Sequence, residues 1–317
     1  MLIAVFLTVA GLLLLYYGAE ALVTGSSRLA LDFGVRPLIV GLTVVAFATS
    51  MPELMVSLFA AIKGSDSIAA GNIVGSNIAN IALILGVAAL LHPLDVARST
   101  LSREIPMMIF ASLLVYLFAW DGILGFGNGF ILFAGLLLFI GYCVATARTT
   151  TDFTTETVRE QVSGIAGDRR RNLWLVLFGI VGLGAGAEMM VRGAVIIAAW
   201  FGVPEVIIGL SIVALGTSLP ELAASLMSAW KGEMDISVGN VIGSNIFNVL
   251  FVLGICPMVR PLAIESRVLL VDFPVMLGFC LLLVVLLLAG KPRRRLGRYR
   301  GGLLLGAYSL FIASLFF

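Results

Sequence analysis

The chain has 317 residues, of which 60% are hydrophobic and only 12% are charged, and its mean hydropathy is +1.11. Soluble domains carry about 25% charged residues, so this composition excludes an ordinary soluble protein and predicts an all-α integral membrane protein. The formal net charge of +2 is too small to indicate a protein that binds nucleic acid.

Apolar runs long enough to cross a bilayer recur along the whole sequence. We expect ten spans, at about residues 2–26, 35–62, 67–90, 104–119, 124–147, 172–199, 203–230, 236–257, 268–289 and 300–316. No charged segment precedes the first span, so we interpret it as a helix of the protein and not as a cleaved signal. The polar, arginine-rich segment 148–171 is predicted to be a linker between two halves, residues 1–147 and 172–317.

The basic residues predict how the spans are oriented in the membrane. If the segment 148–171 lies in the cytoplasm, most of the 20 lysines and arginines fall on the cytoplasmic side of the predicted spans. Such an excess of positive charge is typical of cytoplasmic loops. We therefore expect a multi-pass protein of the cytoplasmic membrane with both termini extracytoplasmic.

One stretch of the sequence occurs twice. Residues 41–86 align without a gap with residues 209–254, which lie 168 positions later, and 24 of the 46 aligned residues are identical. Each half holds five predicted spans, an odd number, so the second half should enter the membrane inverted relative to the first. Two inverted repeats of five helices, with broken helices at the bilayer midplane, are the architecture of secondary transporters.

Each repeat places a proline and a glutamate in the middle of an apolar span, as T-S-M-P-E at 49–53 and T-S-L-P-E at 217–221. Proline removes a helical hydrogen bond and clashes with the preceding turn, which predicts a helix break near Ala48 in the first repeat. A broken helix leaves carbonyl oxygens unpaired, and a carboxylate inside a membrane span is costly and usually functional. Hydroxyls, free carbonyls and a carboxylate together suit a hard cation such as Ca²⁺ or Na⁺.

Polar residues spaced four apart share one helix face in each span of the repeat. The pairs are Thr49 with Glu53, Ser76 with Asn80, Thr217 with Glu221, and Ser244 with Asn248. We expect the four faces to surround one cavity with oxygen ligands. Because no histidine or cysteine lies near these motifs, the site is not expected to bind zinc or copper.

Other polar residues in the spans have simpler interpretations. Asn77 and Asn245 lie one residue off the predicted ligand face, which leaves helix–helix hydrogen bonding and cation contact both open. Arg192 follows Glu188 by four residues, which favours a local ion pair. Glu20 has no such partner in its own helix.

Small residues within the spans point to packing. The G-x-x-x-G pairs Gly71/Gly75 and Gly239/Gly243 favour close approach of neighbouring helices. The three cysteines lie in apolar stretches without the spacing of a disulfide framework or a zinc site, so we expect buried, free side chains.

The duplicated motifs T-S-x-P-E and G-N-x-x-G-S-N-I-x-N resemble the alpha-repeats of the cation/calcium exchanger superfamily, most closely its prokaryotic sodium/calcium antiporters. The resemblance implies that two glutamates bind Ca²⁺ and Na⁺ in turn and that the first and sixth spans slide across the rest. Some members carry Asp where this chain has Asn248. The cation ligands that the resemblance implies are Ala46 (carbonyl), Thr49, Ser50, Glu53, Ser76 and Asn80 in the first repeat, and Ala214 (carbonyl), Thr217, Ser218, Glu221, Ser244 and Asn248 in the second.

Three functions from two classes fit these observations. The first is a secondary transporter that exchanges Na⁺ for Ca²⁺ by alternating access, and the second is a Ca²⁺/H⁺ antiporter that uses the same two glutamates. The third is a Ca²⁺-selective channel, which two inverted repeats around a closed central site disfavour. No nucleotide-binding glycine loop and no nucleophile–histidine pairing is present, so we expect no enzyme and no cofactor besides the transported ions. Both halves of the site lie in one chain, which favours a functional monomer in the lipid bilayer.

Overall fold

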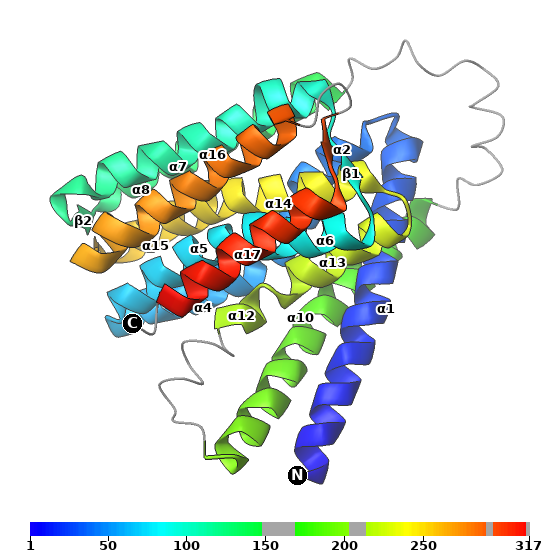
Figure 1. The fold of residues 1–317 in the computed structure, drawn as a ribbon, viewed down its shortest axis with the longest axis horizontal. Helices are drawn as coiled ribbons and strands as arrows, with labels where there is room; N and C mark the ends of the chain where they lie inside the picture. The colour runs from blue at the N-terminus through cyan, green and yellow to red at the C-terminus, as the bar shows by residue number, and fades with distance from the viewer. Residues whose placement is uncertain (148–168, 203–213, 290–293, 315–317) are drawn as a thin grey trace.

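The computed structural model describes residues 1–147, 169–202, 214–289 and 294–314, and these form a bundle of helices (Figure 1). Seven of the described helices are long and apolar enough to cross a membrane, and one bent pair raises that number to eight. The prediction of an all-α membrane protein is therefore confirmed. The count of ten spans and the inverted orientation of the two halves stay predictions.

The first half alternates long helices with short irregular turns. In chain order it contains α1 (Leu2–Phe33), α2 (Pro37–Val40), a π-helical turn (Gly41–Val45), α3 (Ala46–Thr49), α4 (Met51–Lys63), α5 (Asp66–Ala79), a π-helical turn (Asn80–Ile84), α6 (Leu85–Leu91), β1 (Leu94–Asp95), a π-helical turn (Thr100–Glu104), α7 (Ile105–Phe118), a 3₁₀ turn (Ala119–Asp121), β2 (Ile123–Leu124) and α8 (Phe126–Ala147).

The second half follows a closely similar order. It contains α10 (Arg169–Trp200), α12 (Ala214–Thr217), α13 (Leu219–Trp230), α14 (Met234–Phe247), a π-helical turn (Asn248–Val252), α15 (Leu253–Val259), β3 (Leu262–Ala263), a π-helical turn (Val268–Asp272), α16 (Phe273–Ala289), β4 (Arg295–Leu296) and α17 (Arg298–Ser314). The π-helical turns that begin at Asn80 and Asn248 are 168 residues apart, as are those at Thr100 and Val268.

Several boundaries differ from the sequence-based prediction. Helix α1 continues to Phe33, where Gly34 ends it in a left-handed conformation that only glycine adopts without strain. Helix α10 begins at Arg169, so the last three residues of the predicted linker belong to a helix. The rest of that linker and residues 203–213 of the seventh predicted span lie outside the described residues.

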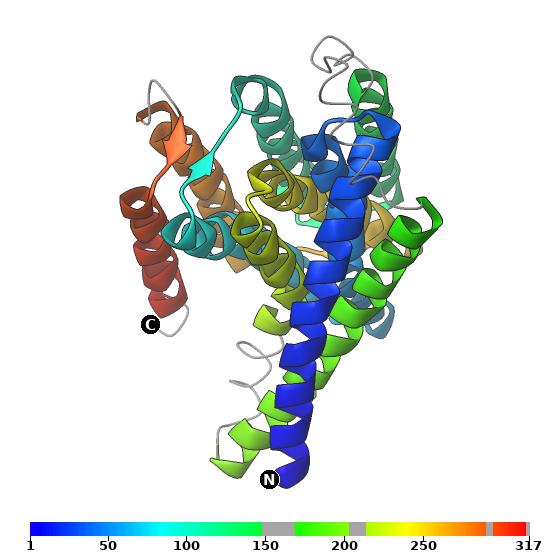
Figure 2. The same cartoon turned by 90° about the vertical axis from the view of Figure 1, so that its right-hand side faces the viewer.

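Helices α1 and α10 run side by side and extend away from the other helices in both views (Figures 1 and 2). Glycines let their backbones approach closely. A Cβ atom on Gly18 would lie 2.8 Å from the Leu183 nitrogen, and one on Gly179 would lie 2.5 Å from the Leu22 nitrogen. Such contacts between small residues are a common basis of helix association in membranes, where lipid removes the hydrophobic driving force.

The centre of the bundle is formed by the helices that carry the second motif. The continuous helical segments Asp66–Leu91 and Met234–Val259 are 78% and 83% buried in their apolar windows, whereas α1 is 28% buried. In the second of these segments, Cβ atoms on Gly239 and Gly243 would lie 2.7 and 2.6 Å from backbone oxygens of the first half. Close packing is thus confirmed for this glycine pair. No atom of the described residues lies within 4 Å of a Cβ added to Gly71 or Gly75, so close packing at the other predicted pair stays a prediction.

Two short antiparallel strand pairs join the halves at their ends. Strand β1 pairs with β4, and β2 pairs with β3. Because β1 and β3 occupy equivalent places in the two repeats, each pair is the counterpart of the other. The strands and the central helices together bring the two duplicated motifs against one another.

Candidate functional site

The site begins at two helix breaks. Helix α3 ends at Thr49 and α4 begins at Met51, and the helical segment Pro37–Thr49 is bent by 43° relative to α4. In the second half Ser218 separates α12 from α13 in the same way. The predicted break is therefore present, and it lies at Ser50, two residues after Ala48. Proline is tolerated in the first turn of a helix, where its missing N–H needs no partner, so Pro52 lies just inside the new helix and the break precedes it.

Each break places a glutamate in the first turn of the following helix. Glu53 is the third residue of α4 and Glu221 is the third residue of α13, and both side chains are fully buried. Unpaired N–H groups give a helix N-terminus a partial positive charge that stabilises a nearby anion. The local sequence thus brings two carboxyl groups into the interior of the protein at the ends of two helices.

A serine from the opposite repeat contacts each carboxyl group, and Ser76 of its own repeat also contacts Glu53. One oxygen of Glu53, Oε1, accepts hydrogen bonds from Ser218 Oγ at 3.3 Å and from Ser76 Oγ at 3.4 Å. In the other half, Glu221 Oε1 accepts a hydrogen bond from Ser50 Oγ at 3.4 Å. The hydroxyls beside one proline therefore support the glutamate beside the other, and the two repeats build a single site.

Four buried oxygens at this site have no hydrogen-bond partner among the described residues. They are Glu53 Oε2, Glu221 Oε2, Asn80 Oδ1 and Asn248 Oδ1. Burying such groups without a partner costs several kcal/mol for a neutral amide and far more for a charge, and buried charges are normally paired or bound to metal ions. Two carboxylate and two amide oxygens are ligands of the kind that Ca²⁺ and Na⁺ accept.

The predicted threonines are held between the repeats. Thr49 Oγ1 lies 3.3 Å from Ser244 Oγ and from the Ala46 carbonyl oxygen, and 3.2 Å from Asn240 Oδ1. Its counterpart Thr217 lies 3.3 Å from Asn72 Oδ1. All ten predicted side chains take part in contacts of the site, and Ala46 joins them through its carbonyl.

The other predicted carbonyl ligand belongs to a short helix of the second repeat. Ala214 is the first residue of α12, four residues before the break at Ser218. Its place in the chain matches that of Ala46, and its role as a ligand stays a prediction.

Two asparagines that were not among the predicted site residues donate hydrogen bonds to the backbone of the two glutamates. The side chain of Asn72 donates to the Glu53 backbone oxygen at 3.4 Å and to Ser57 Oγ at 3.0 Å. In the second half Asn240 donates to the backbone oxygen of the other glutamate at 3.4 Å and to Ser225 Oγ at 2.9 Å. The signal was present in the sequence, because Asn72 is identical in both repeats and lies one helical turn before Ser76.

The two asparagines whose role was left open bond across the interface between the repeats. Asn77 Nδ2 donates to the Asn245 carbonyl at 3.3 Å, and Asn245 Nδ2 donates to the Asn77 carbonyl at 3.4 Å. Their side-chain oxygens accept hydrogen bonds from Asn248 and Asn80. Of the two interpretations, helix–helix hydrogen bonding is the one that these contacts support.

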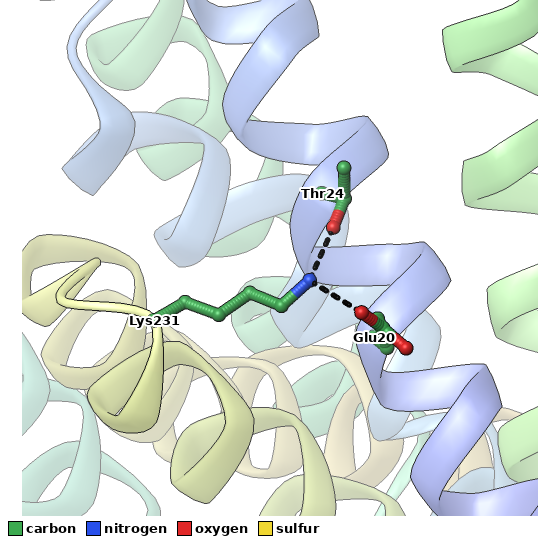
Figure 3. Close-up of polar contacts among 3 residues, drawn as sticks. All are labelled: Glu20, Thr24 and Lys231. Carbon is green, nitrogen blue, oxygen red and sulfur yellow. Dashed lines mark hydrogen bonds and ion pairs between the residues drawn. The ribbon is translucent and has the colours of Figure 1, made fainter.

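The remaining charged residues of the spans are paired at the periphery. Arg192 Nε lies 2.5 Å from Glu188 Oε1, so the predicted local ion pair is confirmed. Glu20 has a partner that its own helix does not supply: Lys231 at the end of α13 reaches α1 and contacts Glu20 Oε1 at 3.1 Å and Thr24 Oγ1 at 2.7 Å (Figure 3). Because these groups are part-exposed, they form an ion pair at the surface between α1 and α13 and are not part of the buried site.

The described residues contain no cluster of three or more His, Cys, Asp or Glu side chains that could hold a metal ion. The site instead combines two carboxylates with neutral oxygens, as the motif pattern predicts. The cysteines Cys143, Cys256 and Cys280 are buried and free, which confirms their interpretation as small apolar side chains.

Comparison with known proteins identifies relatives along the whole chain. A family model described as sodium/calcium exchanger protein matches residues 3–150 and 171–317. The chain is 41% identical over 310 residues to the putative antiporter CaxA of Alkalimonas amylolytica, with 97% of both chains covered. It is 38% identical over 320 residues to the inner membrane protein YrbG of Escherichia coli, covering 100% of this chain and 98% of the relative.

A solved structure has the same fold. The sodium-calcium exchanger NCX_Mj, soaked with Na⁺ and Sr²⁺, superimposes with a TM-score of 0.85 at 32% sequence identity, and 99% of each chain is covered.

Proposed function

Because the chain belongs to the sodium/calcium exchanger family, we propose that it exchanges Na⁺ for Ca²⁺ across the cytoplasmic membrane by alternating access. The observation that carries this proposal is the set of four buried oxygens at the interface between the repeats that have no partner among the residues the structure describes. Two of them belong to the carboxylates of Glu53 and Glu221, whose combined charge balances one Ca²⁺. Family membership supports transport as such, and the coupling to Na⁺ is our inference.

The chemistry of the site supports a cargo of hard cations. The glutamate and asparagine oxygens and the surrounding serine and threonine hydroxyls provide only oxygen ligands, which Ca²⁺ binds in groups of six to eight with irregular geometry. Neutral hydroxyls beside Glu53 and Glu221 also suit Na⁺, whose single charge needs less compensation. We therefore propose that Ca²⁺ and Na⁺ occupy overlapping positions in turn, through the twelve residues that the resemblance implies.

Helices α1 and α10 are the elements that we propose to move. They pack mainly on one another along the glycine contacts at Gly18 and Gly179, and they extend beyond the compact bundle (Figure 2). Sliding of this pair past the two helix breaks would open the site to one side of the membrane at a time. Alternating access of this kind is typical of transporters built from repeats with discontinuous helices.

We further propose that both termini are extracytoplasmic and that the protein functions as a monomer in the membrane. The orientation rests on the arginines and lysines of the predicted cytoplasmic loops. The monomer rests on the site itself, since Glu53 and Glu221 come from one chain and each is contacted by serines of that chain.

The test is Ca²⁺ uptake into proteoliposomes that hold the purified protein. Imposing an outward Na⁺ gradient should drive uptake of radioactive Ca²⁺, and equal Na⁺ on both sides should abolish it. A pH gradient without Na⁺ should drive none. Uptake driven by the pH gradient alone would instead establish Ca²⁺/H⁺ antiport, and single-channel currents far above transporter turnover would establish a channel.

A further inference from the structure

Four asparagines form a closed set of amide contacts between the two repeats, and for two of them the sequence left helix–helix bonding and cation contact both open. Asn77 and Asn80 come from α5 and its end, and Asn245 and Asn248 come from α14 and its end. None of the four side chains is more than 1% exposed. Each Asn80 or Asn248 amide bonds an asparagine of the opposite repeat, and not one of its own.

Backbone carbonyls determine which way these amides face. The Asn245 carbonyl oxygen can only accept a hydrogen bond, so the atom of Asn77 that lies 3.3 Å away must be the NH₂ group. The other side-chain atom of Asn77 is then its oxygen, which also only accepts. Asn248 Nδ2 lies 3.1 Å from that oxygen and is the donor. By elimination, the remaining atom of Asn248, which points away from this bond, is Oδ1.

The same deduction applies to Asn245 and Asn80. The Asn77 carbonyl accepts from Asn245 Nδ2 at 3.4 Å, which makes the other atom of Asn245 an oxygen. Asn80 Nδ2 donates to it at 3.0 Å. The sulfurs of Met276 and Met108 lie 3.6 and 3.5 Å from the NH₂ groups of Asn77 and Asn245 and favour the same orientation.

The outcome is that two amide oxygens, Asn80 Oδ1 and Asn248 Oδ1, are left buried without a partner among the described residues. We propose that Asn77 and Asn245 are positioning residues, each of which locks the amide of the opposite repeat so that its oxygen, and not its NH₂, faces the transported cation. This inference rests on the proposed cation site. An amide that turned over would present a donor to a positive ion and lower its affinity.

The proposal assigns each positioning residue to one amide. Asn245 orients Asn80, and Asn77 orients Asn248. Each therefore acts on an asparagine of the opposite repeat and not on the asparagine three residues further along its own segment. Residues that orient metal ligands typically change metal affinity by about 10- to 100-fold when they are replaced. Replacing Asn245 by alanine should weaken Ca²⁺ binding by that factor, because Asn80 loses the acceptor that fixes its amide.

The experiment is a double-mutant cycle on the Ca²⁺ affinity of the purified protein, measured from Ca²⁺-dependent thermal stabilisation. The variants are Asn245→Ala, Asn80→Ala and their combination. Once the Asn80 side chain is gone, removing the Asn245 side chain should weaken Ca²⁺ binding little further. The matched control combines Asn80→Ala with Asn77→Ala, whose effects should multiply because they act through different ligands.

Further arms keep the proposal open to refutation. The Asn77/Asn248 cycle should give the same result in the second half, and Asn245→Ser replaces the alanine variant should that one fail to fold. Independent effects in the Asn80/Asn245 cycle would overturn the proposal. So would an Asn245 variant with a lower unfolding temperature without Ca²⁺ but wild-type Ca²⁺ affinity, because such a residue only stabilises the helix interface.

The affinity measurement also separates this inference from the proposed exchange. Wild-type protein that binds Ca²⁺ and shows the predicted coupling, yet carries no Na⁺-driven Ca²⁺ flux, would refute the exchange and leave the amide lock standing. Normal flux with no coupling would do the reverse. Wild-type protein without any Ca²⁺ binding would refute both.

Discussion

Replacing either buried glutamate by glutamine should weaken Ca²⁺ binding by roughly two to four orders of magnitude and make the cation-free protein more stable. Glu53 and Glu221 are both fully buried, and each has one oxygen bonded to a serine and one without a partner among the described residues. Glutamine has the same size but removes the charge. In the absence of Ca²⁺ it therefore relieves the cost of a buried carboxylate, which should raise the unfolding temperature.

The loss of affinity follows from the charge that is removed. Taking one partner from a buried charged cluster costs about 3–5 kcal/mol, which corresponds to roughly two to four orders of magnitude in the dissociation constant of Ca²⁺. At a Ca²⁺ concentration about 100 times its dissociation constant, binding stabilises the wild type by about 2.7 kcal/mol. At that same concentration Glu53→Gln and Glu221→Gln should show almost no stabilisation by Ca²⁺.

Thermal unfolding of purified protein with and without Ca²⁺ measures both effects at once. Glu188→Gln is the matched control, because that side chain is 60% exposed and contacts Arg192 outside the site. It should keep the full stabilisation by Ca²⁺. If Glu53→Gln and Glu221→Gln were stabilised by Ca²⁺ as strongly as the wild type, the carboxylates would not be cation ligands and the reasoning would be refuted.

Three further predictions concern the helices and the charge of the site. Gly179→Leu should reduce transport more than about tenfold, because its Cβ would meet the Leu22 backbone at 2.5 Å. Gly184→Leu on the same helix is the control and should transport normally, because no atom among the described residues lies within 4 Å of the added Cβ. Equal flux in both variants would refute the role of the close contact. Lys231→Gln should lower the free energy of unfolding by less than about 1 kcal/mol and leave Ca²⁺ affinity unchanged, since its ion pair is part-exposed; a large loss in a chemical denaturation experiment would contradict this. Na⁺-driven Ca²⁺ flux should be the same with and without K⁺, because two carboxylates balance one Ca²⁺, and a strict need for K⁺ would show that the charge count is wrong.

Much of the site could be predicted because its motif occurs twice in the sequence. The 168-residue offset singles out Glu53 and Glu221 together with their neighbouring hydroxyls, and the structure brings these groups to one interface. The length of the apolar runs also predicted most of the long helices, since an apolar run of about 20 residues leaves few alternatives to a membrane span.

The parts that could not be predicted depend on contacts between distant segments. Asn72 acts through the backbone of Glu53, and a pattern of residue types does not reveal which buried amide meets which carbonyl. The partner of Glu20 is Lys231, 211 residues away, and no rule of local spacing connects them. The break at Ser50 was placed two residues early because proline can begin the second helix and need not end the first.

The central claim is that Ca²⁺ and Na⁺ occupy one site built by both repeats. Equilibrium binding of radioactive Ca²⁺ to the purified protein, titrated with Na⁺, tests it most directly. We predict one Ca²⁺ per chain, complete displacement by Na⁺ with competitive behaviour, and no binding to the Glu53→Gln/Glu221→Gln variant. Ca²⁺ that stays bound at saturating Na⁺, or that binds this variant as it binds the wild type, would contradict the shared site.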